Sequence, residues 1–484
     1  GYHPTGNYNT WVGYNAGFGT AAASAGQNVG VGHEALMNVS SGIENTVMGY
    51  LAGRSVTSGH YNTILGSRAA DAITTITGTV AIGYAALGAG AGSNYDVAIG
   101  YEAHRDGANR GVFIGLQAGA ATTGGGTIIG SEAGETNTVG NLTLVGYEAG
   151  KLVSGTADSM VAVGHGVSTN ASGTYHTMVG FQAGNQLKGN VNTGLGYKVL
   201  QSGTNAIHQS NIAIGYQTMQ GGNYSVTNQD NVAIGVNALR YASGSSYNVV
   251  IGQALFQQNQ QSTQVVAIGY RALSGATSTA ATTAVGHLAG RDLTTGDYNT
   301  LIGKSAGLEN ETSHGNSVLG FEAGYYPTGA YNTFMGYRAG KGTSSADAGS
   351  NVGIGQEAMM NLTSGDENTA VGSQAGYSLS TGGFNVAIGS DSLRAATTAN
   401  YNVAIGKNAM SSGILTSSFN IGVGFEALKN AQGAATENVS LGAYSGRDLT
   451  TGTLNTFVGT YAATGNTTGQ ENVAIGHSAL QENQ

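Results

Sequence analysis

The sequence predicts an all-β protein: a parallel β-solenoid, of the β-roll or β-helix kind, with about 28 coils in a trimeric fibre. Three observations predict this fold. A short repeat fills all 484 residues, β-branched residues alternate within each copy, and a glycine closes each alternation. The repeat reads Asn-[Thr/Val]-x-[Ile/Val/Leu/Met]-Gly-x-x-Ala, with a mean period near 17, and repetition at a fixed period is typical of solenoids. Its glycine stands at positions 13, 32, 49, 66, 83, 100, 115, 130, 146, 164, 180, 196, 215, 235, 252, 269, 286, 303, 320, 336, 355, 372, 389, 406, 424, 442, 459 and 476.

The strand of each coil is predicted from the residues before the glycine. The residue directly before it is Val, Ile, Leu or Met in all 28 copies, and the residue two earlier is Thr, Val or Ile in 27, with Ser317 as the exception. Residues i and i+2 of a strand share a face, and β-branched residues favour strands. We therefore expect both positions to face the core, so that Ile234, for example, is buried. Seventeen residues suffice for a coil of two short parallel strands.

The residue between these two positions predicts self-association. It is usually small beside valine, as in Val386-Ala387, and often bulky beside threonine, as in Thr456-Phe457. If it points outward, it forms an apolar stripe that a lone chain would leave in water. A strand that is buried on one face alternates apolar and polar residues, whereas a strand that is buried on both faces is apolar throughout. An apolar outward residue therefore indicates that the second face is covered as well. The sequence therefore predicts a parallel homotrimer whose chains meet along this stripe, which includes Trp11, Ala233, Phe334, Ala387, Ala404, Phe457 and Ala474.

Asparagine and alanine occupy two further columns of the repeat. Asparagine stands four residues before the glycine in 19 copies, from Asn9 to Asn472, and alanine three residues after it in 22. In-register stacking lets side-chain amides bond to one another along a ladder. We favour this ladder over the alternative, a ring of amides that holds an ion on the trimer axis. The alanine column predicts tight packing near a corner.

Composition excludes several classes of protein. Glycine accounts for 82 residues without a three-residue period and proline for two, so collagen is excluded. The absence of cysteine excludes disulfides and cysteine-bound metals. No apolar run is long enough to span a bilayer, so no membrane insertion is expected. A thinly spread net charge of −9 argues against nucleic acid as a partner.

The array is predicted to be a single continuous domain over residues 1–484, with local irregularities. Coil spacing varies most over about 100–235, where the longest insertions, 201–209 and 220–229, are polar. Insertions in solenoids form loops that often bind partners, although we favour neutral drift in tolerant loops as the explanation. Residues 1–53 and 324–376 align without gaps with 33 identities, which indicates a segmental duplication.

Aromatic residues supply the candidate binding site. Nine tyrosines directly follow the repeat glycine and form one column, which phenylalanines and histidines share. Such rings could stack on the sugars of a cell-surface glycan, but we favour the alternative, in which they stack on one another with their hydroxyls in water. Together with two residues of the insertions, the candidate receptor or glycan contacts are Tyr14, Tyr50, Tyr84, Tyr101, Tyr147, Tyr197, Tyr216, Tyr270, Tyr337, His208 and Tyr224.

Catalytic motifs are absent or accidental, so the sequence predicts no enzyme, no catalytic residue, no cofactor and no metal. Gly303-Lys-Ser-Ala-Gly307 matches a nucleophile-elbow pattern, but its first glycine belongs to the repeat and no strand-to-helix turn is expected there. Asp292 and Asp448 lie in matching Gly-Arg-Asp-Leu-Thr-Thr-Gly segments, which suggests a turn. Two alternatives to a structural role remain. One is a glycan-degrading spike with paired carboxylates, and the other is an ice- or mineral-binding threonine array, which an inward threonine column disfavours.

The strings Asn-Val-Ala-Ile-Gly-Tyr-x-Ala-Leu and Thr-Thr-Gly-x-x-Asn-Thr-x-x-Gly resemble the repeats of bacteriophage-type tail fibres and related surface fibres. The Asn-Val-Ala-Ile-Gly core is also similar to the head repeats of trimeric autotransporter adhesins. The resemblance covers the whole chain and implies a homotrimeric β-solenoid outside the cell, on a virion or a cell surface. The implied function is that of a rigid shaft or head that mediates attachment to a host or a surface. We expect further segments of such a fibre to flank this sequence.

Overall fold

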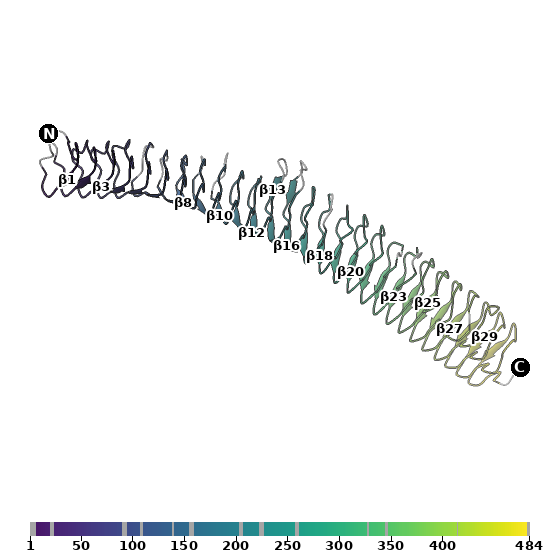
Figure 1. The fold of residues 1–484 in the computed structure, drawn as a ribbon. Coiled ribbons are helices and arrows are strands. Elements are labelled where there is room, and N and C mark those ends of the chain that lie inside the picture. The colour runs from purple at the N-terminus through teal and green to yellow at the C-terminus, as the bar shows by residue number, and fades with distance from the viewer. Residues whose placement is uncertain are drawn as a thin grey trace. The chain divides into compact units, whose positions relative to one another are not determined.

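The computed structural model describes residues 6–19, 24–89, 94–106, 110–137, 140–153, 159–202, 207–221, 227–256, 261–326, 329–343, 347–413 and 415–481. Within this part the protein is all-β, and no helix of it is long and apolar enough to cross a membrane. The chain divides into two units, residues 1–244 and 245–484. In each unit the coils follow one another as a parallel β-solenoid, which confirms the predicted fold class (Figure 1).

Each repeat contributes one strand of three to five residues to a parallel sheet. In the first unit these strands are β1 Thr10–Val12, β2 Val29–Val31, β3 Thr46–Met48, β4 Thr63–Leu65, β5 Val80–Ile82, β6 Val97–Ile99, β7 Gly111–Ile114, β8 Gly126–Ile129, β9 Leu142–Val145, β10 Val161–Val163, β11 Thr177–Val179, β12 Thr193–Tyr197, β14 Ile212–Tyr216 and β16 Val232–Val236. In the second unit they are β17 Val249–Ile251, β18 Val266–Ile268, β19 Thr283–Val285, β20 Thr300–Ile302, β21 Ser317–Leu319, β22 Thr333–Met335, β23 Val352–Ile354, β24 Thr369–Val371, β25 Val386–Ile388, β26 Val403–Ile405, β27 Ile421–Val423, β28 Val439–Leu441, β29 Thr456–Val458 and β30 Val473–Ile475.

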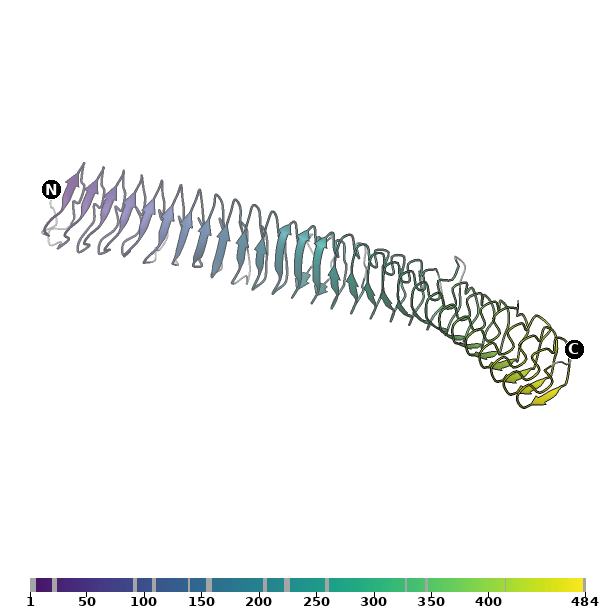
Figure 2. The ribbon, with the colours of Figure 1, turned by 90° about the horizontal axis from the view of Figure 1, so that it is seen from below.

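The strands pair in register, so that equivalent residues of successive coils stack into columns. Ala387 of β25 lies opposite Ala404 of β26, and Gly196 of β12 lies opposite Gly215 of β14. Figure 2 shows the strands of the first unit side by side and pointing in the same direction. The strands of the duplicated block, β1–β3 and β22–β24, begin at equivalent positions of its two copies.

Left-handed residues close each coil where we expected a second strand. In the coil that begins at Gly303, positive φ occurs at Gly303 (134°), Ser305 (57°), Gly307 (57°) and Gly315 (67°). Each such residue turns the chain sharply, so one coil closes within 17 residues with a single strand. The expectation of two strands in every coil was therefore wrong.

Two constraints restrict the repeat position to glycine: its positive φ and the close approach of the next coil. A Cβ on Gly303 would lie 2.3 Å from the carbonyl oxygen of Gly320 in the next coil. Atoms at that distance overlap, and an L-residue rarely adopts a φ of 134°. The same approach joins successive repeat glycines from Gly13 to Gly235 in the first unit and from Gly252 to Gly476 in the second, so the constraint passes along the column within each unit.

The residue between the two aliphatic positions faces the core, which reverses the predicted orientation. It is buried in 27 of the 28 strands, and Trp11 is half-buried, whereas the positions on both sides of it are half-buried or exposed throughout. Ala233, Ala387 and Phe334 lie inside the coil, and Ile234 lies on its outer face. The predicted inward orientation of the two flanking columns was wrong. The interior of a thin coil has room for one side chain per strand, and this is the central residue, whose size varies from coil to coil. The two columns that flank it lie on the outer face.

The bulky and small core residues complement one another within a coil. The buried residue of each strand packs against the residue that stands four positions after the repeat glycine of the same coil. A Cβ on Gly307 would lie 2.8 Å from Leu301 Cδ2, and one on Gly340 would lie 2.3 Å from the Phe334 ring. Where the strand carries alanine, this position often carries leucine, as in Ala233 and Leu239, both fully buried. The pattern of small and bulky residues that we attributed to packing between chains therefore has a cause within the chain.

This complementarity predicts a strong coupling between Leu301 and Gly307. Leu301→Ala leaves a cavity and should cost about 2–5 kcal/mol. Gly307→Leu places side-chain atoms where the Leu301 side chain already lies and should cost about 1–3 kcal/mol. The double variant reproduces the alanine–leucine pair found at Ala233 and Leu239, so we expect its unfolding free energy to exceed the additive value by about 1–3 kcal/mol. Urea unfolding of the four proteins measures the coupling, and additive losses would contradict it.

The asparagine ladder is present and lies inside the coil. Asn385 Nδ2 donates to Asn368 Oδ1 at 3.0 Å and to the Ala399 carbonyl at 2.7 Å, and Asn385 Oδ1 accepts the backbone N–H of Asn402 at 3.0 Å. The amides therefore satisfy one another and the turn backbone. Because they are buried within a single chain, they cannot form the alternative ring around a trimer axis. In nine coils another residue replaces asparagine in this column: Thr79, Asp96, Gly111, Gly126, Leu142, Met160, His176, Val265 and Thr282.

Each of the two longest insertions contains a strand. Strand β13 (Ile207–Gln209) pairs in parallel with β15 (Thr227–Gln229), and the two form a sheet of their own. Its register places His208 opposite Asn228. The extra residues of these coils therefore build a second strand that most coils lack.

Candidate functional site

The outer face of the strands presents two uncharged columns. One holds the Thr, Val or Ile residue of each strand, with Ser317 as the exception, and the other holds its Val, Ile, Leu or Met residue; neither column is buried in any strand. No charged residue occurs in either column. Val12, Met48 and Leu195 are about half exposed. We call these two columns the strand face.

Charged side chains gather instead at the corner that follows the strand. Lys151 forms ion pairs with Glu132, with Glu135 at 3.5 Å and with Glu148 at 3.2 Å. In the second unit Glu322 accepts from Arg338 and Lys341, each at 2.9 Å. Except for Lys151–Glu148, which lies within one coil, these pairs join successive coils. The corner therefore carries paired charges, whereas the strand face is uncharged.

The tyrosine column lies beside the strand face, and its rings stack on each other. All nine tyrosines are exposed, between 36% and 66%. Tyr197 and Tyr216 are 4.9 Å apart between ring centroids with planes at 6°, and Tyr84 and Tyr101 are 5.1 Å apart at 16°. The other contacts of the column are Tyr14–His33, His33–Tyr50, Tyr147–His165, His165–Phe181, Phe181–Tyr197, Tyr270–His287 and Phe321–Tyr337.

This stacking limits what the column can bind. A ring inside a stack, such as Tyr197 between Phe181 and Tyr216, has both faces covered and exposes its edge and hydroxyl. Such a ring can donate and accept hydrogen bonds but cannot stack on a sugar. Only a ring at the end of a stack keeps a face without an aromatic neighbour in its column. Tyr270 is one of these, because the preceding coil carries Gln253 at that position.

A second aromatic column escaped the sequence analysis. It directly precedes the asparagine column, and its residues have positive φ and are more exposed than most of the first column. Phe384, Tyr401 and Phe419 stack there with centroids 4.8 and 5.1 Å apart. The recurrent Tyr-Asn-Thr and Tyr-Asn-Val strings would have identified it. Its described members are Tyr8, Tyr61, Tyr95, Tyr175, Tyr247, Tyr298, Tyr331, Phe384, Tyr401 and Phe419.

Of the two candidate residues of the insertions, the structure describes one, His208, and it does not join the tyrosine column. His208 lies in β13 and is fully buried, so its ring is not presented to a ligand in this structure. Tyr224 lies outside the described residues. The remaining nine candidates form separate short stacks along the chain, and no single site brings them all together.

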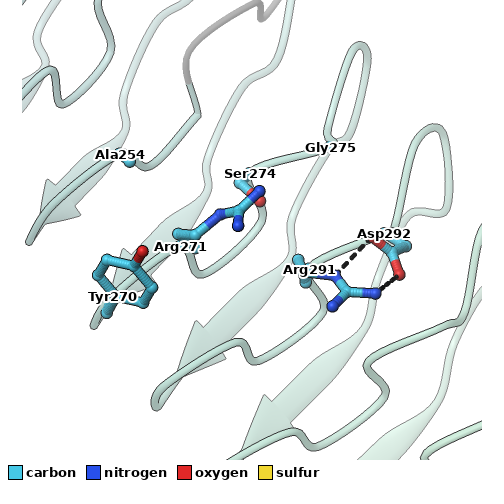
Figure 3. Close-up of a pocket in the computed structure, with 7 residues that line it drawn as sticks. All are labelled: Ala254, Tyr270, Arg271, Ser274, Gly275, Arg291 and Asp292. Atoms are coloured by element: carbon cyan, nitrogen blue, oxygen red, sulfur yellow. Dashed lines mark hydrogen bonds and ion pairs between the residues drawn. The ribbon is translucent and has the colours of Figure 1, made fainter.

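A surface hollow of about 390 Å³ adjoins Tyr270 (Figure 3). It lies on the corner of three successive coils, within the second unit. Arg291 Nε donates to Asp292 Oδ1 at 2.7 Å, and a second bond joins the same two side chains. Figure 3 draws no such bond at Arg271. The lining residues are Ala254, Tyr270, Arg271, Ser274, Gly275, Arg291 and Asp292.

The described residues contain no group of three His, Cys, Asp or Glu side chains that could hold a metal ion. The nucleophile-like string places Ser305 in the turn after β20, with a φ of 57° and its side chain almost buried. Gly307 of that string gives room to Leu301. Asp292 and Asp448 each accept a hydrogen bond from the arginine that precedes them. The Arg447 guanidinium donates to Asp448 Oδ2 at 2.9 Å. Both aspartates lie in the turn that their shared sequence segment predicted.

Together, the stacked coils, the buried amide ladder and the uncharged strand face define a parallel β-solenoid repeat protein. The chain matches no family model, no curated protein and no solved structure. Its function must therefore be argued from its own surfaces.

Proposed function

We propose that this chain is a structural segment of an extracellular fibre, in which three parallel copies associate through their strand faces and the assembled shaft or head mediates attachment. The strand face carries the proposal. One of its columns is Val, Ile, Leu or Met in every coil, the other is Val or Ile in 15 coils and Thr or Ser in 13, and neither carries charge, whereas the corner beside them carries paired charges. An exposed aliphatic column that runs through every coil, on an uncharged face, is typical of an interface.

A second copy of the same chain fits this face better than an unrelated partner does. The face repeats once per coil, at about 4.8 Å, and a copy in parallel orientation has the same repeat. Side chains can then interdigitate along the whole length of both chains. A thin coil also gains from such contact, because its own core buries little apolar surface. The predicted homotrimer is thus retained, with the strand face in place of the residues now assigned to the core.

Mass in solution tests the assembly. We expect about three times the chain mass of 48.5 kDa by light scattering, with no dissociation on dilution. A stable species of 48.5 kDa would refute association of any kind, and twice that mass would refute the trimer.

A pair of matched variants tests which face makes the contact. Ile388→Asp with Ile405→Asp introduces charge on the strand face, where water reaches both side chains in a lone chain. We expect the circular dichroism of the coil to persist while the mass falls. Ala387→Asp lies one residue away but points into the core, and it should disorder its coil because a buried unpaired charge is costly. Unchanged mass in the double variant would exclude the strand face as the interface.

One observation favours a second candidate, an ice- or mineral-binding array. Threonines such as Thr46 and Thr300 lie on the strand face, so the inward orientation that disfavoured this function does not hold. Threonine occupies 12 of 28 positions in its column, however, and the other column is aliphatic. The hydroxyls therefore form no unbroken lattice. Thermal hysteresis of a solution of the chain would decide between this function and the fibre.

A further inference from the structure

The hollow beside Tyr270 contains a guanidinium without a counter-ion. Arg271 stands two residues after the repeat glycine, and the same position carries Ala254 in the coil before it and Leu288 in the coil after it. No described side chain pairs with its guanidinium. Arg338 occupies the same position in another coil, but there Glu322 of the preceding coil binds its Nε at 2.9 Å.

The hollow as a whole carries a small positive charge. Its lining contains the guanidiniums of Arg271 and Arg291 and the carboxylate of Asp292. Asp292 holds Arg291 through two bonds and so fixes its orientation while neutralising it. The remaining unit of positive charge, at Arg271, matches a single anionic group. The chain has a net charge of −9, which opposes the approach of a densely charged polyanion.

The other lining groups suit a sugar. Tyr270 stacks on His287 at 5.3 Å with one face, and no ring lies beyond its other face in the column. An aromatic face can pack on the apolar side of a pyranose, and the Ser274 hydroxyl can donate to or accept from a sugar hydroxyl. The hollow extends over three coils and therefore over about 10 Å, which accommodates more than one sugar ring.

We infer that the hollow formed by Tyr270, Arg271 and Ser274 binds a carboxylate-bearing sugar within an acidic glycan. The planar guanidinium of Arg271 pairs with the carboxylate through two parallel hydrogen bonds, a geometry that suits carboxylates. The Tyr270 ring packs on the sugar, and the orientation of Arg291 places a second donor at the far end of the hollow. This inference rests on the proposed function only in placing the chain outside the cell, where such glycans occur.

Binding of defined oligosaccharides to the full chain tests the inference. The probes are a hyaluronan hexasaccharide, in which glucuronate alternates with N-acetylglucosamine, chitohexaose as its neutral counterpart, and a heparin hexasaccharide as a densely sulfated one. We expect hyaluronan to bind at least tenfold more tightly than chitohexaose. Equal binding of these two, or tighter binding of heparin than of hyaluronan, would overturn the assignment.

Two arginine variants separate the hollow from general surface charge. Arg271→Ala should weaken hyaluronan binding at least tenfold, whereas Arg338→Ala, at the same coil position but already paired with Glu322, should leave it unchanged. Equal losses in both variants would show that the hollow is not the site. The mass of each variant is measured in parallel. If the assembly is intact while hyaluronan does not bind, this inference fails and the proposed fibre stands.

Discussion

Replacing Gly303 by alanine is expected to disrupt the coils around it, at a cost of about 3 kcal/mol or more. The new Cβ would lie 2.3 Å from the Gly320 carbonyl oxygen, and the backbone at φ 134° tolerates no side chain without strain. The carbonyl cannot move away without breaking the pairing of the next coil. Hydrogen exchange of residues 286–320 and the midpoint of urea unfolding measure the effect.

Gly476 offers a matched control for this substitution. Its φ of 123° is also positive, but a Cβ on it would meet nothing within 4 Å. Gly476→Ala therefore keeps the conformational strain and removes the collision between coils. We expect it to cost about 1 kcal/mol. Similar losses in the two variants would mean that backbone strain, and not contact between coils, selects glycine in this column.

Acidification is expected to destabilise the first unit more than the second. Burial lowers the pKa of His104 and of His208 from 6.5 to about 4, and it also lowers the pKa of His176. The three side chains are buried, whereas His287, His314 and His477 of the second unit are exposed. Asp96 lies 3.9 Å from His104, and His176 Nδ1 accepts the N–H of Asn192 at 3.4 Å.

The direction of the effect follows from where the protons bind. Below pH 6.5 the unfolded chain protonates these rings, while the folded chain keeps His104 and His208 neutral until the pH approaches 4. Stability is therefore fully present above pH 6.5 and falls between pH 6.5 and about 4, by about 3 kcal/mol each for His104 and His208. Urea unfolding of the first unit at pH 7 and at pH 4.5 measures the loss.

The repeat supplies the variants that remove this dependence. Leucine occupies the position of His104 in the preceding coil, at Leu87, and asparagine lies opposite His208 in β15, at Asn228. His104→Leu with His208→Asn should therefore fit both sites and reduce the loss between pH 7 and 4.5 by several kcal/mol. An unchanged pH dependence would assign the acid sensitivity to carboxylates instead.

Periodicity determined most of the architecture. The 17-residue repeat, the β-branched alternation and the glycine column predicted in-register parallel coils, and the asparagine column predicted the amide ladder, although not its burial. These features follow from backbone geometry, which is the same in every copy. The tyrosine stacks could likewise be anticipated, since equivalent residues of in-register coils must lie about 4.8 Å apart. The second aromatic column was equally readable but went unnoticed.

The direction in which each strand faces was decided by the tertiary structure. Alternation shows that Ala387 and Ile388 lie on opposite faces but does not say which face is the core. The core volume decided it, because Leu301 fits only where Gly307 makes room, and Gly307 lies beyond the end of the strand that carries Leu301. The unpaired state of Arg271 also depends on its neighbours, Ala254 and Leu288, in two other coils. The sequence by itself determined a repeating coil and its register. Only the packing of one coil on the next decided which residues fill it and which form its surface, because burial depends on the space that several coils share.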